Sequence, residues 1–160
     1  DLGLLAMMYG TAYVARIALG GKDTQTVRAF QEAESYPGPS LLIAYSPCIA
    51  HGYDLKFGID QQKLAVESGY WPLYRFDPRR LDKGEPPLQL DSVPSRSDLT
   101  QFMRNETRFR MVEHQEPERF RHLVAEAQRH NAYRTALYQH LATVVPSAVA
   151  SGQRPPKEGA

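Results

Sequence analysis

The stretch Ser-Leu-Leu-Ile-Ala-Tyr at residues 40–45 decides the fold class of this sequence. It is a short and nearly continuous apolar run, and the turn-forming sequence Tyr-Pro-Gly-Pro at residues 36–39 comes directly before it. Strands buried on both faces of a parallel sheet are near-continuously apolar, whereas half-exposed strands alternate between apolar and polar residues. The run therefore predicts a buried strand of a parallel sheet in an α/β domain.

Short elements separated by glycine and proline surround this strand. We predict, in chain order, the end of a buried helix at 2–8, a strand at 13–19, a helix from Asp23 or Thr24 to Glu34 and, beyond residue 45, a helix at 61–68 and a short strand at 73–76. Helices thus alternate with strands, and we interpret residues 1–95 as the C-terminal half of an α/β sheet domain.

The second half of the sequence changes character. Pro86, Pro87 and Pro94 predict an irregular stretch, after which Ser97 or Asp98 can cap a helix that reaches Phe109. A long polar helix should then run from Glu116-Pro117 to Leu141, with a set of apolar positions and with arginines and acids on its solvated faces. We predict a helical segment at 96–145 that completes the domain, and a flexible tail at 146–160.

Composition limits the class of protein. The 160 residues allow one domain, and the formal net charge of +1 argues against a dedicated nucleic-acid binder. No apolar run is long enough to span a bilayer, and the first 20 residues carry no recognisable signal peptide. Because the sequence starts at Asp1 rather than Met, we expect a piece of something larger.

The one cysteine, Cys48, is the most interesting candidate for chemistry. A single thiol excludes an internal disulfide and a metal cage built from this chain's cysteines alone. Cys48 follows the predicted buried strand, and ligands of open α/β sheets collect beyond the carboxyl ends of strands. The residues leave three interpretations open: a buried apolar cysteine, a metal or cluster ligand, or a nucleophile with His51 as its base.

Three other patterns have a structural interpretation that we favour over a functional one. His122, Glu126 and His130 share a helical face and could chelate a metal, but neighbouring arginines favour a solvated polar face. The aromatic residues at 70–76 could stack on bases, but the near-zero net charge favours core packing. Arg79 and Arg80 could bind an anion, but arginines more often pair with carboxylates such as Asp77 or Asp82.

Three long motifs carry a resemblance to a known family. They are Ala-Glu-Ser-Tyr-Pro-Gly-Pro-Ser-Leu-Leu-Ile-Ala-Tyr-Ser-Pro-Cys-Ile at 33–49, Ala-Val-Glu-Ser-Gly-Tyr-Trp-Pro-Leu-Tyr-Arg at 65–75 and Pro-Leu-Gln-Leu-Asp-Ser at 87–92. In this order they resemble the C-terminal region of pyruvate:ferredoxin (flavodoxin) oxidoreductase, strongly to about residue 110 and weakly beyond. The resemblance implies that residues 1–95 are the C-terminal half of a thiamine-diphosphate-binding parallel-sheet domain followed by a helical tail.

The resemblance also implies an activity. Members of this family oxidatively decarboxylate pyruvate on thiamine diphosphate with Mg, give acetyl-CoA and CO2, and pass electrons through iron–sulfur clusters to ferredoxin or flavodoxin. Cys48 stands at the position of a ligand of the 4Fe-4S cluster nearest the thiamine. The other cluster ligands, the Mg motif and the coenzyme A site lie upstream in the family, so we expect no catalytic residue here and no cofactor on this chain alone.

The expected partners follow from the same resemblance. They are the rest of a parent polypeptide, ferredoxin or flavodoxin, pyruvate and coenzyme A, and a second subunit in a homodimer; the location would be cytoplasmic, without nucleic acid or membrane. The alternatives are a related 2-oxoacid or NADP-coupled oxidoreductase, or a non-catalytic interaction module. If upstream chain covers this piece, apolar surface around Leu4, Leu5, Ile17 and Leu42 should be exposed here.

Overall fold

The central strand of the fold is β1 (Tyr13–Ile17), in which all five residues are buried. The computed structural model describes residues 1–92 and 98–145. Within them β1 lies in a four-stranded sheet of order β2-β1-β3-β4. Strand β2 (Ser40–Ala44) pairs with β1 in parallel, from Tyr13 opposite Ser40 to Ile17 opposite Ala44. The short strands β3 (Tyr74–Phe76) and β4 (Leu88–Leu90) add antiparallel pairs.

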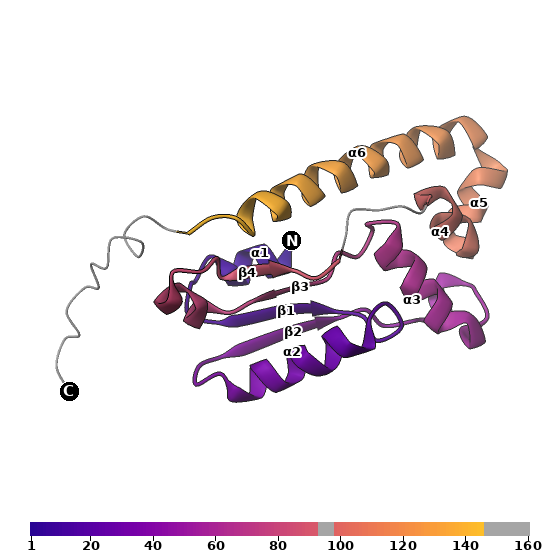
Figure 1. The fold of residues 1–160 in the computed structure, drawn as a ribbon. Helices are drawn as coiled ribbons and strands as arrows, with labels where there is room; N and C mark the ends of the chain where they lie inside the picture. Colours follow the sequence, from indigo (N-terminus) through magenta and orange to yellow (C-terminus); the bar gives the residue numbers. More distant parts are fainter. Residues whose placement is uncertain (93–97, 146–160) are drawn as a thin grey trace.

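Helices cover both faces of this sheet (Figure 1). Because side chains of a strand alternate between faces, Tyr13, Ala15 and Ile17 pack on one side against helix α2 (Asp23–Ser35) through Ala29. On the other side Val14 belongs to a cluster with residues of α1 (Leu2–Met7) and α6 (Pro117–Leu141). The two-sided cover explains the complete burial of β1.

A helical group stands at one end of the sheet (Figure 1). It consists of α3 (Gly58–Glu67), α4 (Leu99–Asn105), α5 (Thr107–Gln115) and the first turns of α6. Its core is a cluster of six buried apolar residues: Ala65, Leu99, Phe102, Met103, Phe120 and Val124. Three short 3-10 turns, η1 (Ile49–His51), η2 (Leu55–Phe57) and η3 (Pro78–Lys83), lie in the connections.

The α/β class is confirmed, but two details of the predicted sheet are wrong. The sheet is mixed rather than parallel, with one parallel pair among its three. The run at 40–45 is an edge strand of the described sheet and not a strand buried on all sides: its three middle residues are half-buried, and Ser40 and Ala44 are exposed. Its apolar pattern has a physical reason, since Leu41 packs on one face of the sheet and Leu42 on the other.

Two predicted features of the second half also change. The proline-rich stretch that we expected to be irregular contains β4. The helix expected to continue to Phe109 breaks at Glu106, where α4 ends and α5 begins. The long helix α6 is confirmed between Pro117 and Leu141. Pro94, the Ser97 cap, the domain boundary at 95/96 and the tail at 146–160 lie outside the described residues.

Apolar surface is exposed, although not at all four expected positions. Leu5 is 65% exposed, and Leu4 and Leu42 are half-buried, whereas Ile17 is buried beneath α2. Exposed apolar side chains also lie on α1 and the turn after it, namely Leu2, Met8 and Tyr9. Among the described residues, none of the helices has the length and apolar character that crossing a membrane requires.

Helix α1 lies so close to the sheet that Gly3 has room for no side chain. A Cβ built on Gly3 would lie 1.7 Å from the hydroxyl oxygen of Tyr74, which is fully buried. We expect Gly3→Ala to lower the free energy of unfolding by about 1–3 kcal/mol, since overpacking of a tight core has that cost. Thermal or denaturant unfolding measures the change.

Gly58→Ala is the matched control. A Cβ at Gly58, the first residue of α3, would meet only Pro47, at an ordinary contact distance of 3.5 Å. This substitution should be neutral or stabilise by at most about 1 kcal/mol, because alanine favours the helix. Equal stabilities of the two variants would contradict the tight packing of α1.

Candidate functional site

Cys48 lies in the loop that follows β2, here called the Cys48 loop (residues 46–57). The parallel ladder continues one residue past β2, where the amide of Tyr45 donates to the carbonyl of Ile17 at 3.0 Å. The backbone at Cys48 is extended, and its carbonyl accepts from the amide of His51 at 3.0 Å, which starts η1. The thiol is free and exposed. Of the three interpretations of Cys48 that the residues left open, that of a buried apolar cysteine is therefore wrong.

A close contact with helix α5 fixes this loop. Gly52 has a φ of +74°, in the left-handed region that favours glycine, and a Cβ there would lie 2.5 Å from the Cβ of Thr107. The hydroxyl of Thr107 donates a hydrogen bond to the carbonyl of Gly52. The first residue of α5 thus holds the turn just after η1, so that the position of Cys48 depends on the helical group.

A buried carboxylate lies beneath the loop. Glu106 is fully buried between α4 and α5. Its Oε2 accepts from Nε of Arg108 at 2.6 Å, and its Oε1 accepts from the amide nitrogen of the Gln61 side chain at 3.2 Å. The Nδ1 atom of His51 lies 3.8 Å from the same Oε1, so a protonated His51 forms an ion pair with it. A buried charge needs such partners, and one of them comes from the Cys48 loop.

Two tyrosines complete the surroundings of Glu106. The hydroxyl of Tyr45 donates to Oε1 of Glu106 at 3.5 Å, and burial together with that negative charge raises the pKa of Tyr45. The ring of Tyr53 stacks on His51 with 6.4 Å between ring centroids. Burial, with smaller contributions from Glu106 and Cys48, raises the pKa of Tyr53. Its buried hydroxyl has no hydrogen-bond partner among the described residues.

This geometry sorts the interpretations of Cys48. His51 faces Glu106 and stacks on Tyr53, so the structure gives no support to His51 as the base of a cysteine nucleophile. In the part of the chain that the structure describes, no three His, Cys, Asp or Glu side chains gather in a way that could hold a metal ion. The thiol of Cys48 is exposed, on a loop that Thr107 of α5 holds next to the edge strand β2 of the described sheet.

The histidines of α6 do not form a second site. His122 and His130 are 72% and 81% exposed, and each lies about one helical turn from Glu126, at 3.8 and 4.0 Å. Arg129 also pairs with Glu126. The solvated polar face that the sequence favoured is confirmed.

The aromatic stretch at 70–76 belongs to the core, as expected. Leu73, Tyr74 and Phe76 are buried. Tyr70 lies 4.5 Å from Phe102 between ring centroids, and Trp71 lies 5.2 Å from Tyr45. Tyr70 and Trp71 are half-buried, and their rings join the sheet to the helical group.

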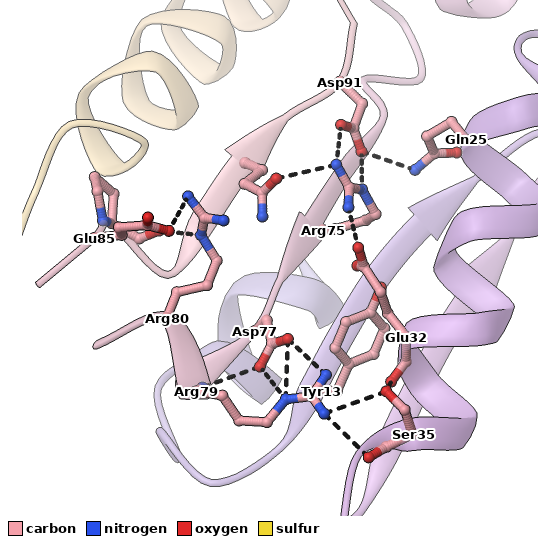
Figure 2. Close-up of polar contacts among 12 residues, drawn as sticks. Tyr13, Gln25, Glu32, Ser35, Arg75, Asp77, Arg79, Arg80, Glu85 and Asp91 are labelled. Atoms are coloured by element: carbon pink, nitrogen blue, oxygen red, sulfur yellow. Dashed lines mark hydrogen bonds and ion pairs between the residues drawn. The ribbon is translucent and has the colours of Figure 1, made fainter. Parts of the chain in front are cut away.

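Arginines on the α2 side of the sheet pair with carboxylates (Figure 2). Nε of Arg75 donates to Asp91 at 2.8 Å, and its Nη1 donates to Glu32 of α2. Arg79 donates to Asp77 through three contacts of 2.7–3.1 Å and also reaches the carbonyl of Ser35. The pairing of Arg79 with Asp77 is confirmed, whereas Arg80 pairs with Glu85 at 3.0 Å.

Glu106 is the residue that sequence reasoning missed. Its position four residues after Phe102 and three before Phe109 placed an acid on the apolar face of a predicted helix. An acid on such a face is buried only when partners neutralise it. That pattern is the available signal, but the partners Gln61 and His51 come from distant parts of the chain, and their approach is a tertiary feature.

Comparison with known proteins gives several close relatives, although no family model matches the chain. The pyruvate-flavodoxin oxidoreductase of Rhodospirillum rubrum is 54% identical over 144 residues, which are 90% of this chain and 12% of that protein. A probable pyruvate-flavodoxin oxidoreductase of Escherichia coli is 56% identical over 118 residues, 74% of the chain and 10% of the relative. The pyruvate:ferredoxin oxidoreductase of Moorella thermoacetica is 42% identical over 142 residues, 89% of the chain and 12% of the relative.

These identities confirm the resemblance to pyruvate:ferredoxin (flavodoxin) oxidoreductases over nearly all of the chain. They also fix its extent, because the chain spans only about one tenth of the length of these relatives. The relatives are oxidoreductases by name, and the present sequence is similar to a small section of each.

The Glu106 carboxylate should hold the Cys48 loop. In Glu106→Gln the negative charge is lost, so Arg108 loses its ion pair and His51 loses an attraction. We expect the free energy of unfolding to fall by about 1–3 kcal/mol and the amides of residues 48–53 to exchange hydrogen faster. Hydrogen exchange followed by mass spectrometry measures the second effect. Glu113→Gln is the control: it removes the more exposed ion pair with Arg104, and the free energy of unfolding should fall by at most about 1 kcal/mol. Unchanged hydrogen exchange at residues 48–53 in Glu106→Gln would show that Glu106 does not hold the Cys48 loop.

The pair of Asp77 and Arg79 should make stability depend on acid pH. Burial alone would raise the pKa of Asp77, but hydrogen bonds from the side chain and backbone of Arg79 bring it below its ordinary value. A lowered pKa adds stability that is complete above about pH 4 and is lost as the pH falls through the folded-state value. Asp77→Asn should therefore lower the melting temperature at pH 7, and the difference should shrink below pH 4. Asp60→Asn, on an exposed side chain, is the control, and a constant difference for Asp77→Asn across this range would refute the prediction.

Proposed function

We propose that this chain is one section of a longer pyruvate:ferredoxin (flavodoxin) oxidoreductase. The observation that carries the proposal is the identity of 54% over 90% of the chain with a relative of which it spans only 12%. The whole protein would oxidatively decarboxylate pyruvate to acetyl-CoA and CO2 and pass electrons to ferredoxin or flavodoxin. In this proposal the sheet is the C-terminal part of a thiamine-diphosphate-binding domain, and the helical segment completes it.

The form of this section supports its membership of a larger fold. Strand β2 pairs on one side with β1, and its other edge has no neighbouring strand among the described residues. An open edge in a largely apolar strand is a surface that proteins normally cover. The exposed apolar residues of α1 and the following turn add to it, with Met8 85% and Tyr9 80% exposed. Upstream chain of the parent polypeptide would cover both.

Within this protein Cys48 would be a ligand of the 4Fe-4S cluster nearest the thiamine. Cysteine thiolates are the normal ligands of such clusters, and the bound cluster would transfer single electrons. The exposed thiol of Cys48 could supply one ligand to the cluster, and the chain contains no second cysteine that could supply another. Three further ligands, thiamine diphosphate and Mg would be held by parts of the polypeptide beyond this chain.

The remaining residues of the loop would position the thiolate. Thr107 holds the turn at Gly52, and the pair of His51 and Glu106 holds η1 against the helical group. The hydroxyl of Tyr53, buried and without a partner among the described residues, is a free donor in the same loop. Donors close to a cluster sulfur shift its reduction potential, so these residues would tune as well as hold the group.

Substitution of Cys48 tests the proposal. In the complete polypeptide that contains this sequence, Cys48→Ser should reduce the iron content by up to one cluster and remove one set of reduced-cluster signals from the EPR spectrum. The protein should keep its fold, because the thiol is exposed. Iron analysis and EPR of the reduced protein make the measurement.

Ser46→Ala, an exposed neighbour in the same loop, is the control and should leave both readouts unchanged. Unchanged iron and EPR spectra in Cys48→Ser would rule out the ligand role. Assays of the same protein with ferredoxin, flavodoxin and NADP as electron acceptors separate the proposed activity from that of a related NADP-coupled enzyme, and assays with other 2-oxoacids test the substrate.

A further inference from the structure

A cavity rich in hydrogen-bond donors lies on the face of the sheet opposite α2. Its volume is about 360 Å³, and its lining includes Arg16 of β1, Ile43 of β2, Arg134 of α6 and Trp71. Gln61 and Arg108, which hold Glu106 beneath the Cys48 loop, do not line this arginine cavity. Its volume is at the lower end of the range for small-molecule sites.

Arg16 is placed rigidly in this cavity. Its side chain is only 9% exposed, and its guanidinium stacks on the ring of Trp71 at 3.8 Å from the ring centroid. Trp71 is itself fixed, because its indole nitrogen donates to the carbonyl of Ile17 at 3.0 Å. The Nε atom of Arg16 has no hydrogen-bond partner among the described residues. A charged group that is more than nine-tenths buried normally has all its donors paired.

Arg134 repeats the same pattern. Its Nη2 donates to the carbonyls of Gly69 and Tyr70 at 3.1 and 2.6 Å, which anchors the side chain. Its Nε is buried and, like that of Arg16, lacks a partner within the described residues. Burial lowers the pKa of Arg134, and the positive charge of Arg16 lowers it further. Two guanidinium groups therefore share one cavity and repel each other.

Acceptors are too few to balance these donors. Asp1 supplies the carboxylate nearest to Arg16, and its Oδ2 is 3.6 Å from Nη1 of Arg16, longer than a hydrogen bond. The same Oδ2 already accepts from the hydroxyl of Tyr138 at 2.6 Å. The buried hydroxyl of Tyr74 is a third group without a hydrogen-bond partner in the described part of the chain. Among the side chains that line the cavity, two guanidinium groups against the one carboxylate of Asp1 leave an excess of one positive charge.

We propose that the arginine cavity binds a carboxylate group. A single negative charge matches the excess, and its planar pair of oxygens fits the fork of a guanidinium. The carboxylate comes from one of two sources, a small free carboxylate or an acidic side chain elsewhere on the same polypeptide. Trp71 and Ile43 supply an apolar wall for the carbon atoms attached to it.

Crystals of the complete polypeptide that contains this sequence test the proposal. They are grown in chloride without any carboxylate, and a second set is soaked in sodium acetate. A side-chain carboxylate against Arg16 and Arg134 in both sets supports the proposal and identifies the source as the polypeptide. Density for acetate after soaking alone supports a free carboxylate. Water or chloride alone in both sets overturns the proposal.

Solution measurements of variants separate a built site from chance binding of acetate. Arg16→Lys and Arg134→Lys keep the positive charge but lose the forked pair of donors. If the carboxylate is free, acetate should bind roughly tenfold or more weakly to each variant. If the polypeptide supplies the carboxylate, the protection of residues 13–17 from hydrogen exchange should fall by a similar factor. Arg28→Lys, on an exposed arginine of α2, should change neither. Equal weakening in all three variants would overturn the proposal. If a variant fails to fold, the comparison of the unsubstituted protein in acetate and in chloride still tests whether the cavity binds a carboxylate.

Discussion

The parallel pairing of β1 with β2 is the interaction on which the rest of this structure depends. Its register, with Ile17 opposite Ala44, fixes where the chain leaves the sheet and hence where Cys48 lies. The same strand β1 directs Tyr13, Ala15 and Ile17 toward α2 and Val14 and Arg16 toward the opposite face. A shift of one residue would exchange these two sets and place an arginine against the apolar side of α2.

Most buried polar side chains among the described residues are paired. The buried atoms that lack a hydrogen-bond partner there are Nε of Arg16 and Arg134, Oε1 of Gln25, Nδ1 of His51 and the hydroxyls of Tyr53 and Tyr74. On the α2 side, Arg75 is held by Asp91 and Glu32, and between α4 and α5 Glu106 is held by Arg108 and Gln61. Both sets join segments that are distant in sequence, so they fix how the layers sit on one another. The unpaired Nε atoms of Arg16 and Arg134 stand out against this background.

The Cys48 loop and the arginine cavity both lie near strand β2, whose outer edge has no neighbour in the described sheet. This common position has a physical meaning, since an open edge, an exposed thiol and unpaired guanidinium groups are all incomplete by themselves. Each would be completed by groups from outside the chain. That agrees with relatives that are many times longer than this sequence.

The sequence by itself determined the alternation of helices and strands, the family resemblance, the core position of the aromatic stretch at 70–76 and the solvated face of α6. These depend on local spacing and on motifs, which can be read along the chain. It led to a wrong role for the run at 40–45, because an apolar pattern reports cover on both faces and not whether the edge is paired.

Tertiary structure alone decided which polar groups meet. Glu106 lies 45 residues from Gln61 in sequence, and Arg134 is separated from Arg16 by most of the chain, yet each pair shares a site. No local pattern encodes such contacts, because they arise when the helical group docks on one end of the sheet and α6 returns across its face (Figure 1). Sequence thus selected Cys48 as the candidate ligand, while packing decided that its thiol is exposed and what holds its loop.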